Sequence, residues 1–139
     1  MSDSSYTMEL EKGKIREFAK ATGSKAPEYL QDPNPTIPVT FLRTSIFWMP
    51  PNAPSLFGEL KLDLRRVLHG EQDYVFYGPP PRSGAALTVT SRLGGVTEKE
   101  GGRGGRMRFI EIINDFHDES GRLVVRSNQT LIETGKASS

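Results

Sequence analysis

The chain has 139 residues and a mass of 15.4 kDa, enough for one domain with its own core but too little for two ordinary domains. The 18 Lys and Arg nearly balance the 17 Asp and Glu, so the basic excess of nucleic-acid-coating proteins and polybasic membrane binders is missing. The absence of Cys excludes disulfides, a thiol nucleophile, and Cys-ligated zinc or iron–sulfur sites. We therefore expect a single domain over residues 1–139, with no nucleic-acid partner.

The apolar content is low for a compact monomer. Hydrophobic residues make up 35% of the chain, so we expect a partner subunit to complete the core. No apolar run approaches the roughly 20 residues needed to span a bilayer, and the polar N-terminus lacks the apolar region of a signal peptide. These features predict a cytoplasmic protein without a membrane partner. Both ends, residues 1–5 and 136–139, are Ser-rich and are expected to be disordered tails.

The first half of the chain carries two predicted helices. In residues 12–22 apolar side chains recur at i, i+3, i+4 and i+7, and Gly23 follows as a stop signal. Prolines then interrupt residues 24–40. Residues 40–49 are strongly apolar and lie between prolines, which predicts a buried helix that another part of the molecule must cover.

The second half follows a period of two, which is typical of strands. The alternating runs are residues 68–77, 87–93, 107–114 and 123–132. Asp118-Glu119-Ser120-Gly121 predicts a hairpin turn between the last two runs, and the Gly-rich residues 98–105 predict a flexible, charged connection before them. Antiparallel strands with one apolar helix to bury predict an α+β fold, in which a curved sheet wraps that helix. Dimerisation through an edge strand would protect the sheet edge.

Common catalytic motifs are missing from the sequence. There is no phosphate-binding loop, no nucleophile elbow and no His-Glu-x-x-His zinc motif. The two histidines, His69 and His117, lie far apart in the sequence, and we expect each to be a solvated or core residue. We therefore expect no metal and no cofactor. The Arg-Gly-Gly triplet at Arg103 fits a hairpin loop better than an RNA-binding segment, because the net charge is only +1.

One strand segment carries a specific motif, Leu68-His69-Gly70-Glu71-Gln72-Asp73-Tyr74. It resembles the "lHGEQef" strand in the N-terminal-half type of MaoC-like dehydratases and (R)-specific enoyl hydratases. Residues 13–23 are similar to the first helix of this family, and Pro38 to Leu42 to the start of its central helix. Further similar segments are Pro79 to Leu87, Gly104 to Phe109 and Asn128 to Thr134. The resemblance covers nearly the whole chain and implies the hot-dog fold, a curved antiparallel sheet wrapped around one central apolar helix.

The resemblance also implies a chemistry that this chain lacks. Family members bind acyl thioesters of coenzyme A or acyl carrier protein and add or remove water across the 2,3 bond. In active members the first helix leads into G-D-x-N-P-x-H, whose Asp and His position and deprotonate the water. Here Ser24 and Tyr29 occupy those two positions, and neither is a general base near neutral pH without an activating neighbour. A rival alignment at Asp32-Pro33-Asn34-Pro35 puts Ile37 at the His position.

The resemblance therefore implies a non-catalytic subunit of a heteromeric enoyl-CoA hydratase or 3-hydroxyacyl-thioester dehydratase, a lyase of fatty-acid or related lipid metabolism. A catalytic MaoC-like hot-dog subunit would supply the Asp and His, in a heterodimer or a dimer of heterodimers, and the chain would be inactive alone. Two alternatives stay open. One is a self-sufficient homodimeric hydratase or thioesterase that uses His69, Glu71 or His117 as its base. The other is an acyl-CoA-binding regulatory module.

Substrate-binding residues follow from the same resemblance. The candidates for lining an acyl channel are Thr40, Phe41, Phe47, Trp48 and Met49. The candidates for contacting phosphates of coenzyme A or of the carrier's phosphopantetheine are Arg103, Arg106 and Arg108. The motif residues are His69, Gly70, Glu71 and Gln72, and for His69 and Glu71 we expect a structural hydrogen-bonding role.

Overall fold

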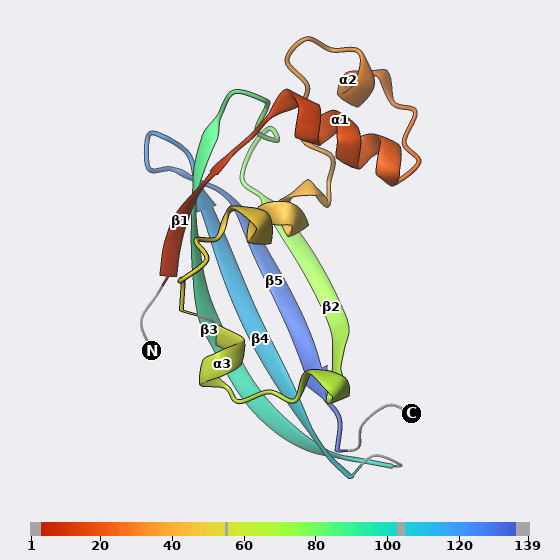
Figure 1. Ribbon diagram of the computed structural model, residues 1–139, viewed down its shortest axis with the longest axis vertical. Helices are drawn as coiled ribbons and strands as arrows, with labels where there is room; N and C mark the ends of the chain where they lie inside the picture. The colour runs from red at the N-terminus through yellow and green to blue at the C-terminus, as the bar shows by residue number, and fades with distance from the viewer. Residues whose placement is uncertain (1–3, 55, 103–104, 136–139) are drawn as a thin grey trace.

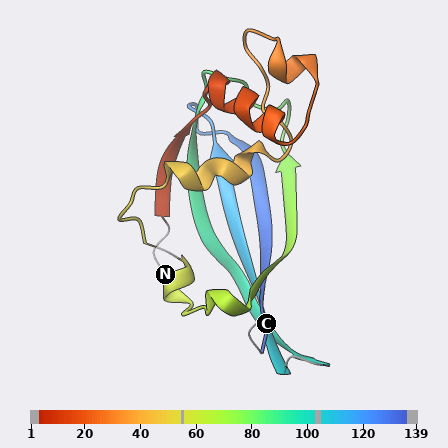
Figure 2. The same ribbon diagram turned by 45° about the vertical axis from the view of Figure 1, so that its right-hand side comes forward.

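The computed structural model describes residues 4–54, 56–102 and 105–135. Five strands form one antiparallel sheet in the order β1-β3-β4-β5-β2 (Figure 1). The strands are β1 (Ser4–Glu9), β2 (Val67–Phe76), β3 (Ala86–Gly101), β4 (Gly105–His117) and β5 (Leu123–Glu133). The helical elements are α1 (Lys12–Ala21), α2 (Pro27–Leu30), η1 (Phe41–Trp48), α3 (Leu56–Glu59) and η2 (Leu64–Arg66). The sheet curves around η1, and α1 and α2 lie at one end of the molecule (Figure 2). The predicted α+β architecture is confirmed.

The first predicted helix is present as α1. Ile15 and Ala19 are fully buried, as expected for the apolar stripe of an amphipathic helix. The helix ends where the sequence indicates, because Gly23 adopts a φ of +79° and its N–H donates to the Lys20 carbonyl at 3.0 Å. Phe18 extends from α1 to meet Phe41 edge-on, with ring centroids 5.5 Å apart.

The apolar segment forms η1, a 3₁₀ helix that is buried on one side only. Phe41, Leu42 and Ser45 face the core, whereas Ile46 is 47% exposed and Phe47 is 80% exposed. With three residues per turn, positions three apart fall on one face and the residues between them point elsewhere. The predicted burial of this helix therefore holds for one face only, and η1 presents an uncovered apolar face.

Two segments predicted as irregular are strands. Residues 4 and 5 are not a disordered tail, because β1 begins at Ser4 and pairs with β3 while Tyr6 and Met8 enter the core. Most of the predicted flexible connection at residues 98–105 continues β3 and β4. Opposite charges support this hairpin, since Arg106 Nε lies 2.6 Å from Glu98 Oε2. The structure does not describe the rest of the predicted tails, residues 1–3 and 136–139. It also does not describe residues 103–104 of the predicted connection.

The predicted hairpin turn after β4 is confirmed. The Gly121 N–H donates to the Asp118 carbonyl at 3.0 Å, and Gly121 has a φ of +85° that favours glycine. The Asp118 carboxylate accepts hydrogen bonds from Ser120 and from the Arg122 N–H, which lower its pKa below the usual value. This turn sets the register in which β4 and β5 pair.

Candidate functional site

A groove of about 560 Å³ lies between α1 and η1. It brings together three of the five predicted channel residues, Phe41, Phe47 and Trp48. The remaining lining residues are Glu11, Lys14, Glu17, Phe18, Ala21 and Thr44. Aromatic side chains therefore form much of its wall, and the charged residues come from the outer side of α1. Such a surface can hold an apolar chain along aromatic rings and keep a polar end near charged groups.

A second, smaller cavity of about 90 Å³ lies on the other flank of η1, against the sheet. Met49, the fourth predicted channel residue, lines this cavity rather than the groove. The fifth, Thr40, is exposed at the N-cap of η1 and lines neither space. The predicted channel residues thus divide between two spaces on opposite sides of one helix.

The dyad positions Ser24 and Tyr29 follow α1. Ser24 Oγ accepts a hydrogen bond from the Ala26 N–H at 3.3 Å, a local turn contact. Tyr29 is half-buried on α2. Neither residue lines the groove or the smaller cavity. In the rival alignment, Asp32 is also tied to its own loop, since its carboxylate accepts from the Asn34 N–H at 2.8 Å.

The His-Gly-Glu-Gln motif lies on β2, the strand at one edge of the sheet. His69 and Glu71 are exposed, and the His69 Nε2 atom lies 3.2 Å from the Glu71 carbonyl oxygen. The register with β5 shifts between these two residues. Gly70 sits at that shift, where an added Cβ would come 2.7 Å from the Ile132 Cδ1 atom. The motif therefore shapes the edge strand.

Gln72, the last motif residue, turns inward. Its Nε2 donates to Ser127 Oγ at 2.6 Å, and it lines the smaller cavity. The sequence reasoning did not single out the inward-facing polar residues that join it there. They are Ser91, Asn114, Ser127 and Gln129. The available signal was the strand alternation, which puts Ser127 and Gln129 on the same face as Leu131.

The two histidines do not meet. His69 lies opposite Leu131 and His117 opposite Leu123 on β5, eight positions and about 25 Å apart along that strand. Within the described residues, no group of three or more His, Asp or Glu side chains could hold a metal ion. Among the described helices, none has both the length and the hydropathy to cross a bilayer.

The predicted phosphate-binding arginines lie at the far end of the sheet. Arg108 is eight residues along β4 from Phe116, which packs in the same core cluster as Phe41, so the two ends lie about 25 Å apart. Arg106 pairs with Glu98, and Arg103 lies outside the described residues. The structure thus keeps Arg106 and Arg108 away from the groove.

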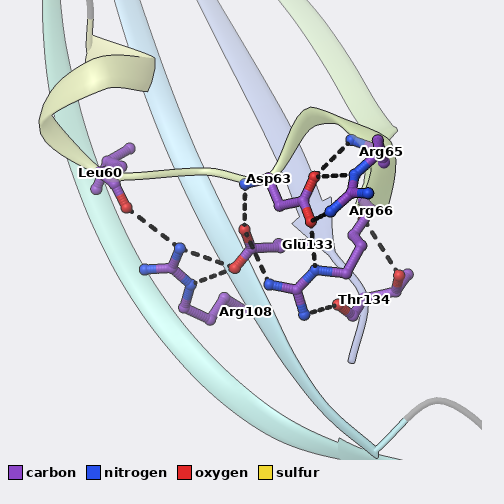
Figure 3. A network of polar contacts seen from close by, with 7 residues as sticks. All are labelled: Leu60, Asp63, Arg65, Arg66, Arg108, Glu133 and Thr134. Carbon is purple, nitrogen blue, oxygen red and sulfur yellow. Dashed lines mark hydrogen bonds and ion pairs between the residues drawn. The ribbon is translucent and has the colours of Figure 1, made fainter. Parts of the chain in front are cut away.

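Arg108 belongs to a network of ion pairs there (Figure 3). Its Nε donates to Glu133 Oε1 at 2.8 Å and its Nη2 to the Leu60 carbonyl at 3.3 Å. Glu133 Oε2 accepts from the Asp63 N–H at 2.9 Å. Hydrogen bonds from Arg65 lower the pKa of Asp63 to about 2. This network holds residues 56–66 against the face of the sheet. Arg108 therefore stabilises the fold in this structure.

Comparison with known proteins identifies the fold and its relatives. The sequence model described as "FAS1-like, dehydratase domain region" matches residues 2–127. The chain is 35% identical over 132 residues to a UPF0336 protein of Streptomyces griseus subsp. griseus, covering 89% of this chain and 83% of the relative.

Solved structures give the same fold. The Mycobacterium tuberculosis HadBC (3R-hydroxyacyl-ACP dehydratase) complex superposes with a TM-score of 0.70 at 19% identity, covering 94% of this chain and 95% of that chain. The ChsH1–ChsH2 complex of the same organism has a TM-score of 0.71 at 14% identity, with coverage of 99% and 85%. The predicted hot-dog fold is confirmed.

Proposed function

We propose that this chain, which belongs to the FAS1-like dehydratase domain family, is the acyl-thioester-binding, non-catalytic subunit of a heteromeric enoyl-CoA hydratase or 3-hydroxyacyl-thioester dehydratase. The observation that carries the proposal is the chemistry at the dyad positions. Ser24 and Tyr29 stand where a hydratase of this family needs Asp and His, and neither lines the groove or the smaller cavity. Water addition needs a general base, and we infer that a partner chain supplies it.

The aromatic groove between α1 and η1 is the proposed site for the acyl thioester. Phe41 is buried and Phe18 is half-buried against it, and Phe47 is solvent-exposed in the same lining. An acyl chain laid against these rings would remove apolar surface from water, at about 25 cal/mol for each Å². Lys14 is the one cation among the described lining residues and its Nζ lies 3.6 Å from Glu17 Oε1, and Glu11 also lines the groove, so the groove offers no net positive charge for a carrier's phosphate.

Two uncovered surfaces fit a hot-dog partner. β2 is ten residues long and has no neighbouring strand on its outer side within the described chain, although edge strands are usually protected. η1 leaves Ile46 and Phe47 in solvent. The HadBC and ChsH1–ChsH2 structures, which share this fold, are complexes of two different named chains. A partner that pairs with β2 and covers η1 would close both surfaces.

The self-sufficient enzyme gains no support from the geometry. His69 and Glu71 are exposed and line neither the groove nor the smaller cavity, and His117 lies at the opposite end of β5 from His69. A regulatory module that only binds acyl-CoA would share the groove but would need no catalytic partner.

The test is to purify the tagged chain from its native cells and identify accompanying proteins by mass spectrometry. The proposal expects a second hot-dog protein with an intact G-D-x-N-P-x-H segment, and expects the pair, but not this chain alone, to hydrate trans-2-enoyl-CoA. Turnover by the isolated chain would contradict the proposal. Acyl-CoA binding without any partner would support the regulatory module instead.

A further inference from the structure

A band of polar side chains crosses the face of the sheet that η1 covers. The strand register places Ser91 opposite Asn114, and Asn114 opposite Ser127. One step further along β5, Gln129 lies opposite Gln72 of β2. Inward positions of a covered sheet are normally apolar. A continuous band of polar side chains at these inward positions is therefore unusual and indicates a role other than packing.

The band divides the hydrophobic core. On one side Val89 and Phe116 belong to the larger apolar cluster, and on the other Ile110 and Leu131 belong to a separate smaller one. A sequence that only had to fold would gain stability by joining the two clusters with apolar residues, because each buried apolar side chain contributes about 1.5–3 kcal/mol. The polar residues thus occupy positions where they stabilise the fold less than apolar ones would.

Two amides in the band lack partners. Gln129 is only 7% exposed, and within the part of the chain that the structure describes its side chain makes no hydrogen bond, although its amide atoms are not fully buried. The Oε1 atom of Gln72 is also buried without a partner there, while its Nε2 donates to Ser127. Buried polar groups are nearly always hydrogen-bonded, so the unpaired Gln72 Oε1 atom indicates that a further group binds there, and the Gln129 amide is free to bind the same group.

Both amides line the cavity of about 90 Å³ beneath η1. Space of this size holds about three water molecules or a few heavy atoms of a ligand. Arg43 and Ile46 also line it and are solvent-exposed, so the cavity has an open side. The lining contains no Asp, Glu, His or Lys, and its one cation is at the exposed side. The buried wall is therefore suited to a neutral hydrogen-bonding group, since a buried unpaired charge is costly.

We propose that this cavity binds a hydroxyl or carbonyl oxygen carried by the acyl chain, and that Gln129 and Gln72 select for it. The proposal rests on the function proposed above. A hydroxyl can donate to the orphaned Gln72 Oε1 atom and accept from the Gln129 amide. A plain hydrocarbon in the same space would leave both amides unpaired, and sites built to hydrogen-bond a hydroxyl reject analogues that lack it. Because the thioester is proposed to lie in the groove on the other side of η1, the oxygen would sit far along the acyl chain rather than at C3, and the test compares the two positions.

The test uses the protein purified together with its accompanying subunit. Calorimetry measures its affinity for three ligands, which are decanoyl-CoA, 3-hydroxydecanoyl-CoA and 10-hydroxydecanoyl-CoA. We expect at least one hydroxylated ligand to bind about tenfold more tightly than decanoyl-CoA, the gain of one well-made hydrogen bond. The preferred ligand identifies the position of the oxygen. Equal affinities for all three, within about twofold, would overturn the inference and mean that the cavity holds only water. No binding of any acyl-CoA would overturn the proposed function as well.

Substitutions in the cavity wall test whether the cavity causes the preference for hydroxylated ligands. Gln129→Met keeps the side-chain length but removes both polar atoms, so it should abolish the preference while the affinity for decanoyl-CoA is kept or raised. Thr130→Val, on the opposite face of the same strand, is the matched control and should keep the preference. If Gln129→Met does not fold, Gln72→Met tests the same cavity from β2. A preference that survives in a folded Gln129→Met or Gln72→Met variant would contradict the inference.

Discussion

Glu133 is a buried carboxylate held by three groups, one from β4 and two from the segment 63–66. Its oxygens lie 2.8 Å from Arg108, 2.9 Å from the Asp63 N–H and 3.7 Å from Arg66. Removing one partner of a buried, hydrogen-bonded ion pair leaves the others desolvated and unpaired. Glu133 is therefore expected to matter more for stability than any surface ion pair in this protein.

We predict that Glu133→Gln lowers the free energy of unfolding by about 2–3 kcal/mol, measured by urea denaturation. The matched control is Glu98→Gln, because Glu98 also pairs with an arginine but its side chain is 44% exposed. The control should cost less than about 1 kcal/mol. Equal costs for the two variants would mean that the buried network adds nothing beyond a surface pair.

The inward polar residues show where residue-level prediction from the sequence stops. Alternation placed Ser127 and Gln129 on one face, but it could not reveal that Gln72 and Asn114 would meet them, because strand order and register bring these residues together only in the fold. In the same way, the sequence marked Arg108 as a cation free to bind phosphate. Its pairing with Glu133 depends on the register between β4 and β5.

At the scale of elements, residues 56–66 form a strap that spans α3 to η2. Leu56, Leu60 and Leu62 pack on the smaller core cluster, and the strap is fastened by Asp63 and Glu133. Hydrogen bonds from Arg65 lower the pKa of Asp63 from 3.8 to about 2. Burial by itself raises the pKa of Glu133, but hydrogen bonds from the Asp63 N–H and Arg108 outweigh this and lower it.

These lowered pKa values predict acid sensitivity of the strap. Both carboxylates stay ionised in the folded protein at a pH where the unfolded chain takes up protons, so their contribution is complete above the unfolded values of 3.8 and 4.5. The contribution of Asp63 is lost as the pH falls toward about 2, and that of Glu133 as the pH falls below 4.5 through its lowered pKa. Amide hydrogen exchange should therefore accelerate first in residues 56–66 as the pH is lowered through this window, after correction for intrinsic rates. In Glu133→Gln the pH dependence should be weaker. Uniform acceleration along the whole chain would refute this account of the strap.

Elements with a complete periodic signal could be predicted from the sequence, and those defined by tertiary packing could not. α1 shows a full apolar stripe and a glycine stop, and it was correctly predicted. β1 is only six residues long and starts among serines, so its alternation of Tyr6 and Met8 was too short to stand out. The segment that forms η1 has apolar residues on both sides of the polar stretch Arg43 to Ser45, and this pattern gave no sign that Phe47 would be left in solvent.

At the scale of the whole molecule, the exposed side of η1 should be part of a subunit interface. Burying one aromatic side chain contributes about 1.5–3 kcal/mol, so Phe47→Ser should weaken binding of the partner at least tenfold. Because Phe47 is exposed in the isolated chain, the thermal midpoint of that chain should not fall. Val96→Ser, an exposed apolar residue on β3, is the control and should leave partner binding unchanged. Analytical ultracentrifugation of the variants with the partner measures the binding, and thermal melting of the isolated chain measures the midpoint. Unchanged binding by Phe47→Ser would place the interface elsewhere.

The central claim is that this chain lends no general base to the reaction. The most direct measurement is the rate of trans-2-decenoyl-CoA hydration by the complex when this chain carries Ser24→Ala and Tyr29→Phe together. The claim predicts a kcat within about twofold of the unmodified complex, because neither hydroxyl takes part in proton transfer. A loss of kcat of about 100-fold or more, in a complex that still assembles, would place the catalytic chemistry in this chain and contradict the claim.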